Sequence, residues 1–267
     1  MIYQRFNPEG WEENFRPMSK DYLNKAMEAG TIMQGVVRKC DSNYNLHIDF
    51  GNNVTGIIPR EEVEAINIDE TGFPKPNICM SKVNQYVQFK VKDIDEKDKY
   101  ILSRKAVGRE ALKWVRDELQ EGQIVNGIVK SIRPYGVFIE IGGGVVGLLH
   151  IEDISVARIK SPLERLKIGQ KANFVVKSID RGNDRILLSY KELLGTWEDN
   201  IKSFEEGSTV LGVAREIEKS KNGIFVELTP NLVGLAEYKE GIEYGQNVSV
   251  YIKRIIPDKK KVKLIIV

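Results

Sequence analysis

Short segments in which apolar and polar residues alternate recur along the chain, and they predict β-strands. The clearest segment reads Tyr-Gly-Val-Phe-Ile-Glu-Ile and begins at Tyr135. Successive side chains of a strand point to opposite faces, so Ile139 and Ile141 should share one face. Phe138 and Glu140 should share the other. A phenylalanine on the face away from the core is an unusual exposure unless something flat stacks on it.

The same pattern occurs three times, so internal repetition is the main organising feature of the chain. A strand with a Gly-Val-Val, Gly-Ile-Val or Gly-Val-Ala opening begins at Gly35, Gly127 and Gly212, and these glycines are 92 and then 85 residues apart. Each copy ends in a Val- and Ile-rich strand, a short charged turn and a further strand. The pattern predicts three copies of one all-β module.

Apolar residues at helical spacing lie between the modules and predict short helical linkers. We expect Trp114 and Trp197 to pin these helices onto an adjacent module rather than to stack on a bound molecule. Helical linkers act as semi-rigid spacers, so the modules should form an elongated row. The first stripe contains Val107, Ala111, Trp114, Val115 and Leu119, and the second contains Leu193, Leu194, Trp197 and Ile201.

The N-terminal region predicts an irregular arm followed by a helix. Proline and glycine recur within residues 1–17, with Trp11 as the expected anchor of the arm. Ser19 should cap a helix that ends at Gly30. The predicted organisation is an arm and helix at 1–28, a module at 29–105, a linker at 106–120, a module at 121–190, a linker at 191–205 and a module at 206–267.

The composition adds a local electrostatic signal. The chain has 267 residues, of which 42% are hydrophobic and 29% are charged, as in an ordinary folded protein. A net charge of +2 is too small for a polybasic protein, so any attraction for nucleic acid must be local. Residues 121–190 contain ten Lys and Arg against seven Asp and Glu, whereas residues 29–105 contain eleven of each. The middle module is therefore the most basic.

Several classes of protein fit the sequence poorly. Cys40 and Cys79 are the only cysteines and are expected to be reduced, and His47 and His150 fall in different modules, so we expect no metal site and no cofactor. The first residues lack the pattern of a secretory signal, and no apolar run is long enough to span a bilayer. We expect a cytoplasmic protein.

Five short motifs occur in a fixed order over some seventy residues of the middle module. They are Glu121-Gly122, Gly127-Ile-Val129, Tyr135-Gly-Val-Phe138, Gly147-Leu-Leu-His-Ile-Glu152 and Arg185-Ile-Leu-Leu-Ser189. In this combination the module resembles the S1 RNA-binding domain, the repeat of bacterial ribosomal protein S1. The resemblance implies three tandem five-stranded OB-fold barrels joined by short α-helical linkers. OB folds bind nucleic acid on the face of their second and third strands.

The resemblance also implies a set of RNA-contacting residues in the middle module. Tyr135 and Phe138 would stack on bases, and His150 would stack or hydrogen-bond at the same face; stacking contributes roughly 1–3 kcal/mol per base. An alternative for Tyr135 is an aromatic that only closes the end of the barrel. The remaining expected contacts are Asp180 and Arg185 at the last turn, and Lys130 and Arg133, which are assigned from location and charge alone.

The flanking modules depart from this pattern. In the first, Tyr44 takes the place of Tyr135, His47 that of Phe138 and Lys99 that of Arg185, while Pro59 replaces the histidine. In the third, Phe225 matches Phe138, but Asn222 and Glu237 replace the tyrosine and the histidine. A glutamate facing phosphate is repulsive. The third module should therefore bind weakly or contact protein, and the first should be intermediate, with protein contact as an alternative.

Three hypotheses on function fit the sequence to different degrees. The leading hypothesis is a non-enzymatic, monomeric protein that resembles ribosomal protein S1, binds single-stranded RNA and acts on mRNA or the small ribosomal subunit. The alternative is a free RNA-binding regulator of translation or RNA turnover that does not dock on ribosomes. An enzyme is disfavoured because the modules and helices account for the whole chain and leave no residues for a catalytic core, and no phosphate-binding Gly-x-x-x-x-Gly-Lys-Ser/Thr loop occurs.

Overall fold

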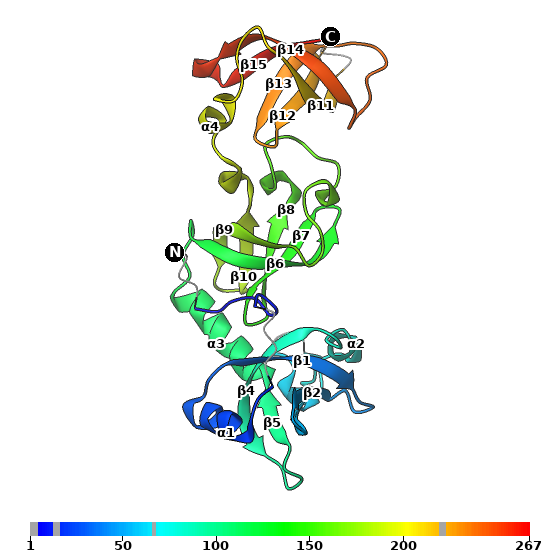
Figure 1. Cartoon of the computed structure of the whole chain (residues 1–267). Coiled ribbons are helices and arrows are strands. Elements are labelled where there is room, and N and C mark those ends of the chain that lie inside the picture. Colours follow the sequence, from blue (N-terminus) through cyan, green and yellow to red (C-terminus); the bar gives the residue numbers. More distant parts are fainter. Residues whose placement is uncertain (1–4, 13–16, 66–67, 219–222) are drawn as a thin grey trace.

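The computed structural model consists of three closed β-barrels in an elongated row, as the repeats predicted (Figure 1). It describes residues 5–12, 17–65, 68–218 and 223–267. Every barrel has five strands in the order 1-2-3-5-4, with one parallel pair between its third and fifth strands. The expectation of three tandem five-stranded barrels is confirmed.

The strands of each barrel follow one another in sequence, and the longest connection lies between the third and fourth strands. Barrel 1 contains β1 (Met33–Cys40), β2 (Leu46–Gly51), β3 (Val54–Ile58), β4 (Tyr86–Ile94) and β5 (Tyr100–Ser103). Barrel 2 contains β6 (Ile124–Arg133), β7 (Gly136–Gly142), β8 (Val145–His150), β9 (Lys171–Asp180) and β10 (Arg185–Ser189). Barrel 3 contains β11 (Thr209–Glu218), β12 (Gly223–Thr229), β13 (Leu232–Glu237), β14 (Asn247–Ile256) and β15 (Lys261–Ile266).

Alternation of side chains places the core as expected. Ile139 and Ile141 are fully buried, whereas Phe138, which directly precedes Ile139, is half-buried on the outer face. The repeated glycine at the start of each module is required by close packing. A Cβ atom on Gly127 would lie 2.5 Å from Cγ2 of Ile139, and one on Gly212 would lie 2.5 Å from Cγ1 of Val226. These distances are well inside van der Waals contact, so only glycine fits.

The first strand of every barrel has a β-bulge at the same place. The register against the second strand shifts between Val37 and Lys39, between Val129 and Ser131, and between Ala214 and Glu216. An extra residue at such a bulge increases the local twist and redirects side chains. The residue paired with the far side of the bulge is His47 in barrel 1, Phe138 in barrel 2 and Phe225 in barrel 3. The proposed correspondence of these three positions is confirmed by register.

The helix that follows the N-terminal arm begins and ends as its sequence predicts. In α1 (Lys20–Ala29), the Ser19 hydroxyl accepts a hydrogen bond from the backbone N–H of Tyr22, and Gly30 ends the helix in the left-handed region. Helix α3 (Arg104–Asp117) connects barrels 1 and 2. Trp114 on α3 is buried in the core of barrel 2, which confirms its structural role. A short α2 (Pro76–Met80) lies in the long loop of barrel 1.

The second linker differs from the single helix that was expected over 191–205. A 3₁₀ turn at Lys191–Leu194 is followed by a five-residue helix, α4 (Trp197–Ile201). Gly195 interrupts them with a φ of 83°. Thr196 then caps α4, and its N–H donates in return to the carboxylate of Asp199. This local hydrogen bonding competes with a continuous helix. Trp197 still packs against barrel 3.

The N-terminal arm lies between barrels 1 and 2 (Figure 1). Phe6 is buried against Trp114, with ring centroids 5.8 Å apart, and Glu9 is also buried. Trp11, the expected anchor, is half-buried, and its carbonyl accepts a hydrogen bond from Lys171. Phe6 and Glu9 are therefore the main anchors. Over the described ranges, no helix is long and apolar enough to cross a membrane.

Candidate nucleic-acid interface

Three neighbouring strands of barrel 2 form an outer face with an apolar floor. Phe138 on β7 pairs with Leu148 on β8, and Leu148 is the register partner of Leu187 in the parallel pair of β8 and β10. Paired residues of adjacent strands share a face, so the three side chains lie side by side. Leu187 is 40% exposed, whereas its chain neighbours Ile186 and Leu188 are buried. We call this surface, with Tyr135 and His150, the outer face of barrel 2.

Tyr135 and His150 border the outer face at one end of the strands. Tyr135 is 51% exposed, and its ring stands edge-on to Phe138 with the centroids 6.3 Å apart. His150 is opposite Gly136, and its Nδ1 accepts a hydrogen bond from the N–H of Glu152 at 3.4 Å. An exposed tyrosine ring, a half-buried phenylalanine ring and an imidazole therefore lie together, which is a surface suited to stacking with flat groups.

Only some of the predicted basic residues lie at this face. Arg185 is exposed at the start of β10, on the same face as Leu187, and Arg133 is exposed at the end of β6 beside Gly136. Asp180 has a different role. Its carboxylate accepts hydrogen bonds from Gly182 and Asn183 in the β9–β10 turn, and these bonds, chiefly those from Asn183, lower the pKa of Asp180. Most hydrogen-bond acceptor sites of the Asp180 carboxylate are therefore already used within the turn.

Lys130 does not join the outer face. It is the extra residue of the β6 bulge, and its ammonium pairs with the buried Glu140 at 2.8 Å and with the Glu9 carbonyl at 3.3 Å. Burial, with the nearby Glu9 carboxylate, raises the pKa of Glu140 above its ordinary value. Lys130 instead lines a crevice between barrels 1 and 2, so its assignment as a phosphate contact of this face is wrong in location.

The corresponding face of barrel 1 is occupied by its own side chains. The guanidinium of Arg60 lies over the rings of Tyr44 and Phe73, 5.1 Å and 5.3 Å from their centroids. His47 Nε2 is 2.9 Å from Asp41 Oδ2. Burial opposes ionisation of Asp41, but hydrogen bonds from His47 and Asn45 outweigh it and hold its pKa at about 2. Lys99 is half-buried in the β4–β5 turn, where its N–H donates to Asp95.

Barrel 3 retains one aromatic at the matching position. Phe225 is half-buried opposite the exposed Leu235, and Glu237 is exposed opposite Gly223. Asn222, which was expected to replace the tyrosine, lies outside the described residues. The face therefore presents a ring beside a leucine, without a second aromatic or a histidine among these described residues.

Leu148 and Leu187 were not among the predicted site residues. The signal was present in the alternation of Gly-Leu-Leu-His and Arg-Ile-Leu-Leu-Ser, where only one leucine of each pair can face the core. Within the described ranges, no group of three or more His, Cys, Asp or Glu side chains is placed to hold a metal ion. The outer face of barrel 2 offers stacking, apolar contact and two exposed arginines.

Comparisons with known proteins agree with this geometry. The family model for the S1 RNA binding domain matches residues 26–105 and 118–191. Small ribosomal subunit protein bS1 of Staphylococcus aureus (strain COL) is 36% identical over 263 residues, which cover 92% of this chain and 64% of that protein. The bS1 protein of Neisseria meningitidis serogroup B is 28% identical over 261 residues, covering 91% and 44%. The chain thus spans less than two thirds of these relatives.

Solved structures also align with this chain. A multidomain protein with nucleic acid binding domains from Streptococcus pneumoniae aligns with 89% of this chain and 73% of its own, at 15% identity and a TM-score of 0.26. The a/eIF2alpha–aDim2p–rRNA complex from Pyrococcus horikoshii aligns with 33% and 52%, at 27% identity and a TM-score of 0.28. Family membership therefore rests on sequence. Barrel 3 lies outside the matched ranges but has the same strand order. This chain belongs to the S1 RNA-binding domain family and is homologous to bacterial ribosomal protein bS1.

Proposed function

We propose that the chain binds single-stranded RNA on the outer face of barrel 2 and catalyses no reaction. The observation that carries this proposal is the grouping of Tyr135, Phe138 and His150 on one exposed face of an S1-type barrel. Stacking on aromatic rings tolerates any base, so unstructured RNA is the expected ligand. Arg185 and Arg133 are close enough to this face to contact phosphates.

The cellular target in this proposal is mRNA at the small ribosomal subunit, in the cytoplasm. Its support is the similarity to bS1 proteins over 92% of the chain. The alternative is a free regulator of translation or RNA turnover that does not associate with ribosomes. Co-sedimentation of the tagged chain with small subunits in a sucrose gradient distinguishes the two. Migration only with the soluble fraction, by a protein that still binds RNA, favours the free regulator.

RNA binding itself is tested by fluorescence anisotropy with a labelled, unstructured RNA at low salt. Replacing Tyr135 with Ala should weaken binding by roughly 1–3 kcal/mol if a base stacks there. A matched control is Tyr22→Ala, because Tyr22 is a similarly exposed tyrosine (53%) on α1 of barrel 1. Equal affinities of the two variants would show that the outer face of barrel 2 does not bind RNA, and would refute the proposal.

A further inference from the structure

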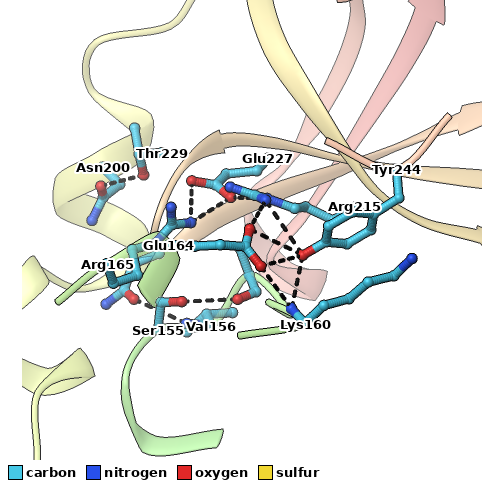
Figure 2. Close-up of polar contacts among 12 residues, drawn as sticks. Ser155, Val156, Lys160, Glu164, Arg165, Asn200, Arg215, Glu227, Thr229 and Tyr244 are labelled. Carbon is cyan, nitrogen blue, oxygen red and sulfur yellow. Dashed lines mark hydrogen bonds and ion pairs between the residues drawn. The ribbon is translucent and has the colours of Figure 1, made fainter. Parts of the chain in front are cut away.

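Barrels 2 and 3 are joined by a buried polar network that fixes their relative orientation. Figure 2 shows the guanidinium groups of Arg215 and Arg165 on either side of Glu227. Each guanidinium lies 2.5 Å from a carboxylate oxygen of Glu227. Arg215 and Glu227 are 8% and 7% exposed. Breaking such a buried pair is strongly destabilising. Tyr244 of barrel 3 adds a hydrogen bond to Glu164.

A second set of contacts lies where the chain leaves the outer face of barrel 2. The segment 151–159 follows His150 and reaches the β12–β13 turn of barrel 3. Its Ala157 N–H donates to the Pro230 carbonyl at 2.9 Å, and its Val156 N–H donates to Asn231 at 3.2 Å. Asn231 in turn donates to the carbonyls of Lys191 and Gly195 in the linker. Segment 151–159 therefore bridges the two barrels.

Two adjoining surface hollows lie along segment 151–159. The first, of about 590 Å³, includes Ile151, directly after His150, and the second, of about 290 Å³, includes Phe225. Both include Val156 and Arg158, so they meet at these residues. Together the two hollows run from Ile151, the residue after His150, to the ring of Phe225, the barrel 3 counterpart of Phe138.

The chemistry along this surface suits a nucleic-acid strand. The Arg158 side chain is 80% exposed at the meeting point, and its Nη1 pairs with Glu216 at 2.8 Å. A guanidinium can contact a phosphate in a bidentate manner or stack on a base. Val156 is 57% exposed beside it, and Phe225 supplies an aromatic ring at the far end. A positively charged side chain near aromatic rings is the combination by which OB folds bind single strands.

We propose that one RNA strand continues from the outer face of barrel 2 across segment 151–159 to Phe225 of barrel 3, with Arg158 contacting it midway. This inference rests on the proposed function, since the strand begins at the face of Tyr135 and Phe138. It gives barrel 3 a role that its own weak set of residues would not provide. The polar network holds the two barrels in one orientation, so the strand meets a preformed surface.

The test uses two labelled RNAs with the full chain. One of roughly six nucleotides should fit on barrel 2 alone, and one of roughly sixteen should also reach barrel 3, within the range of OB-fold site sizes. Arg158→Ala and Phe225→Ala should each weaken binding of the long RNA by about fivefold, the lower end for one stacked base, and leave the short RNA unaffected. Lys25→Ala, on α1 of barrel 1, is the control for loss of a remote positive charge.

A further variant separates RNA contact from a structural role of the ion pair. Glu216→Gln releases Arg158 from its partner, so affinity for the long RNA should hold or rise. If the pair only stabilises the junction, Glu216→Gln and Arg158→Ala should weaken binding alike, and that result overturns the inference. It is also overturned if neither Arg158→Ala nor Phe225→Ala affects the long RNA while Phe138→Ala weakens both RNAs, an outcome in which the proposed function stands. If the unchanged protein binds neither RNA, both proposals fail.

Discussion

Replacing Glu9 with Ala should release the N-terminal arm from between barrels 1 and 2. Glu9 is 4% exposed, and both its carboxylate oxygens accept hydrogen bonds from Arg104, at 2.7 Å and 2.9 Å. One of them also accepts from the N–H of Gln88 in β4. Burial alone would raise the pKa of Glu9, but the Arg104 guanidinium outweighs it and lowers that pKa to about 2. The carboxylate is therefore ionised at neutral pH.

The free energy lost in Glu9→Ala depends on the interaction partners that Arg104 keeps. Removing one partner of a buried ion pair costs roughly 3–5 kcal/mol, because the other charge stays buried without compensation. The Arg104 side chain is only 5% exposed, but it keeps Glu64 at 2.9 Å and the Val63 carbonyl at 3.0 Å. We therefore expect a loss at the lower end, about 3 kcal/mol, which corresponds to roughly a hundredfold in the opening equilibrium of the arm.

Hydrogen exchange measured by mass spectrometry reports this opening directly for residues 5–12, since local openings set the exchange of individual segments. Peptides from the arm should exchange roughly a hundredfold faster in Glu9→Ala. Arg5→Ala is the matched control, because the Arg5–Glu118 pair joins the same arm to the end of α3 but is about half exposed. An exposed pair contributes roughly 0–1 kcal/mol. Equal protection in the two variants would refute the claim that the buried pair holds the arm.

Three other outcomes are expected. First, burial and the Glu9 carboxylate raise the pKa of Glu140 above its usual 4.5 in the folded state, so the free energy of unfolding should fall as pH rises above that value. Glu140→Gln lacks this ionisation. In urea unfolding, its free energy of unfolding should therefore rise relative to that of the unchanged protein between mildly acid and neutral pH. Second, in anisotropy titrations Phe138→Ala should cost roughly 1–3 kcal/mol of RNA affinity, Phe225→Ala less and His150→Ala an intermediate amount; equal losses at Phe138 and Phe225 would contradict this ranking. Third, log affinity against log salt should have a slope near −0.7 per neutralised phosphate, with about two to five phosphates; a slope that implies about ten would contradict it.

The fold could be predicted because its signals are local and repeated. Alternating side chains gave the inward position of Ile139 and the outward position of Phe138, and the capping residues Ser19 and Gly30 gave the limits of α1. Repetition supplied the third barrel, whose own residues depart most from the motif. In each case the deciding interaction lies within one strand, one turn or one helix end, so a short window of sequence contains it.

The arm could not be predicted because its contacts are distant and aperiodic. The N–H of Glu9 donates to Glu140, 131 residues away, and Phe6 is a single apolar residue in an irregular segment. The pattern correctly placed Glu140 on the face opposite Ile139, but it could not show that the arm buries this position. Lys130 was misassigned for the same reason, since its partner Glu140 lies on another strand.

The structure also explains why the same bulged strands serve two purposes. In barrels 2 and 3 the extra residue of the bulge is basic, and it pairs with a buried glutamate on the next strand: Lys130 with Glu140, and Arg215 with Glu227. Both pairs lie at a junction with the preceding part of the chain. The residue two positions before each glutamate is the outward aromatic, Phe138 or Phe225.

Barrel 1 provides the internal comparison. Its equivalent residues, Arg38 and Asp49, have the same charges, but both are exposed. The buried pairing therefore does not follow from the charges alone and needs a neighbouring segment to exclude water. Because a strand is stiff over two residues, the junction that fixes Glu140 or Glu227 also fixes the position of the adjacent aromatic. Orientation of the barrels and geometry of their outer faces should consequently change together, so that variants loosening a junction alter RNA affinity even where they touch no RNA-facing residue.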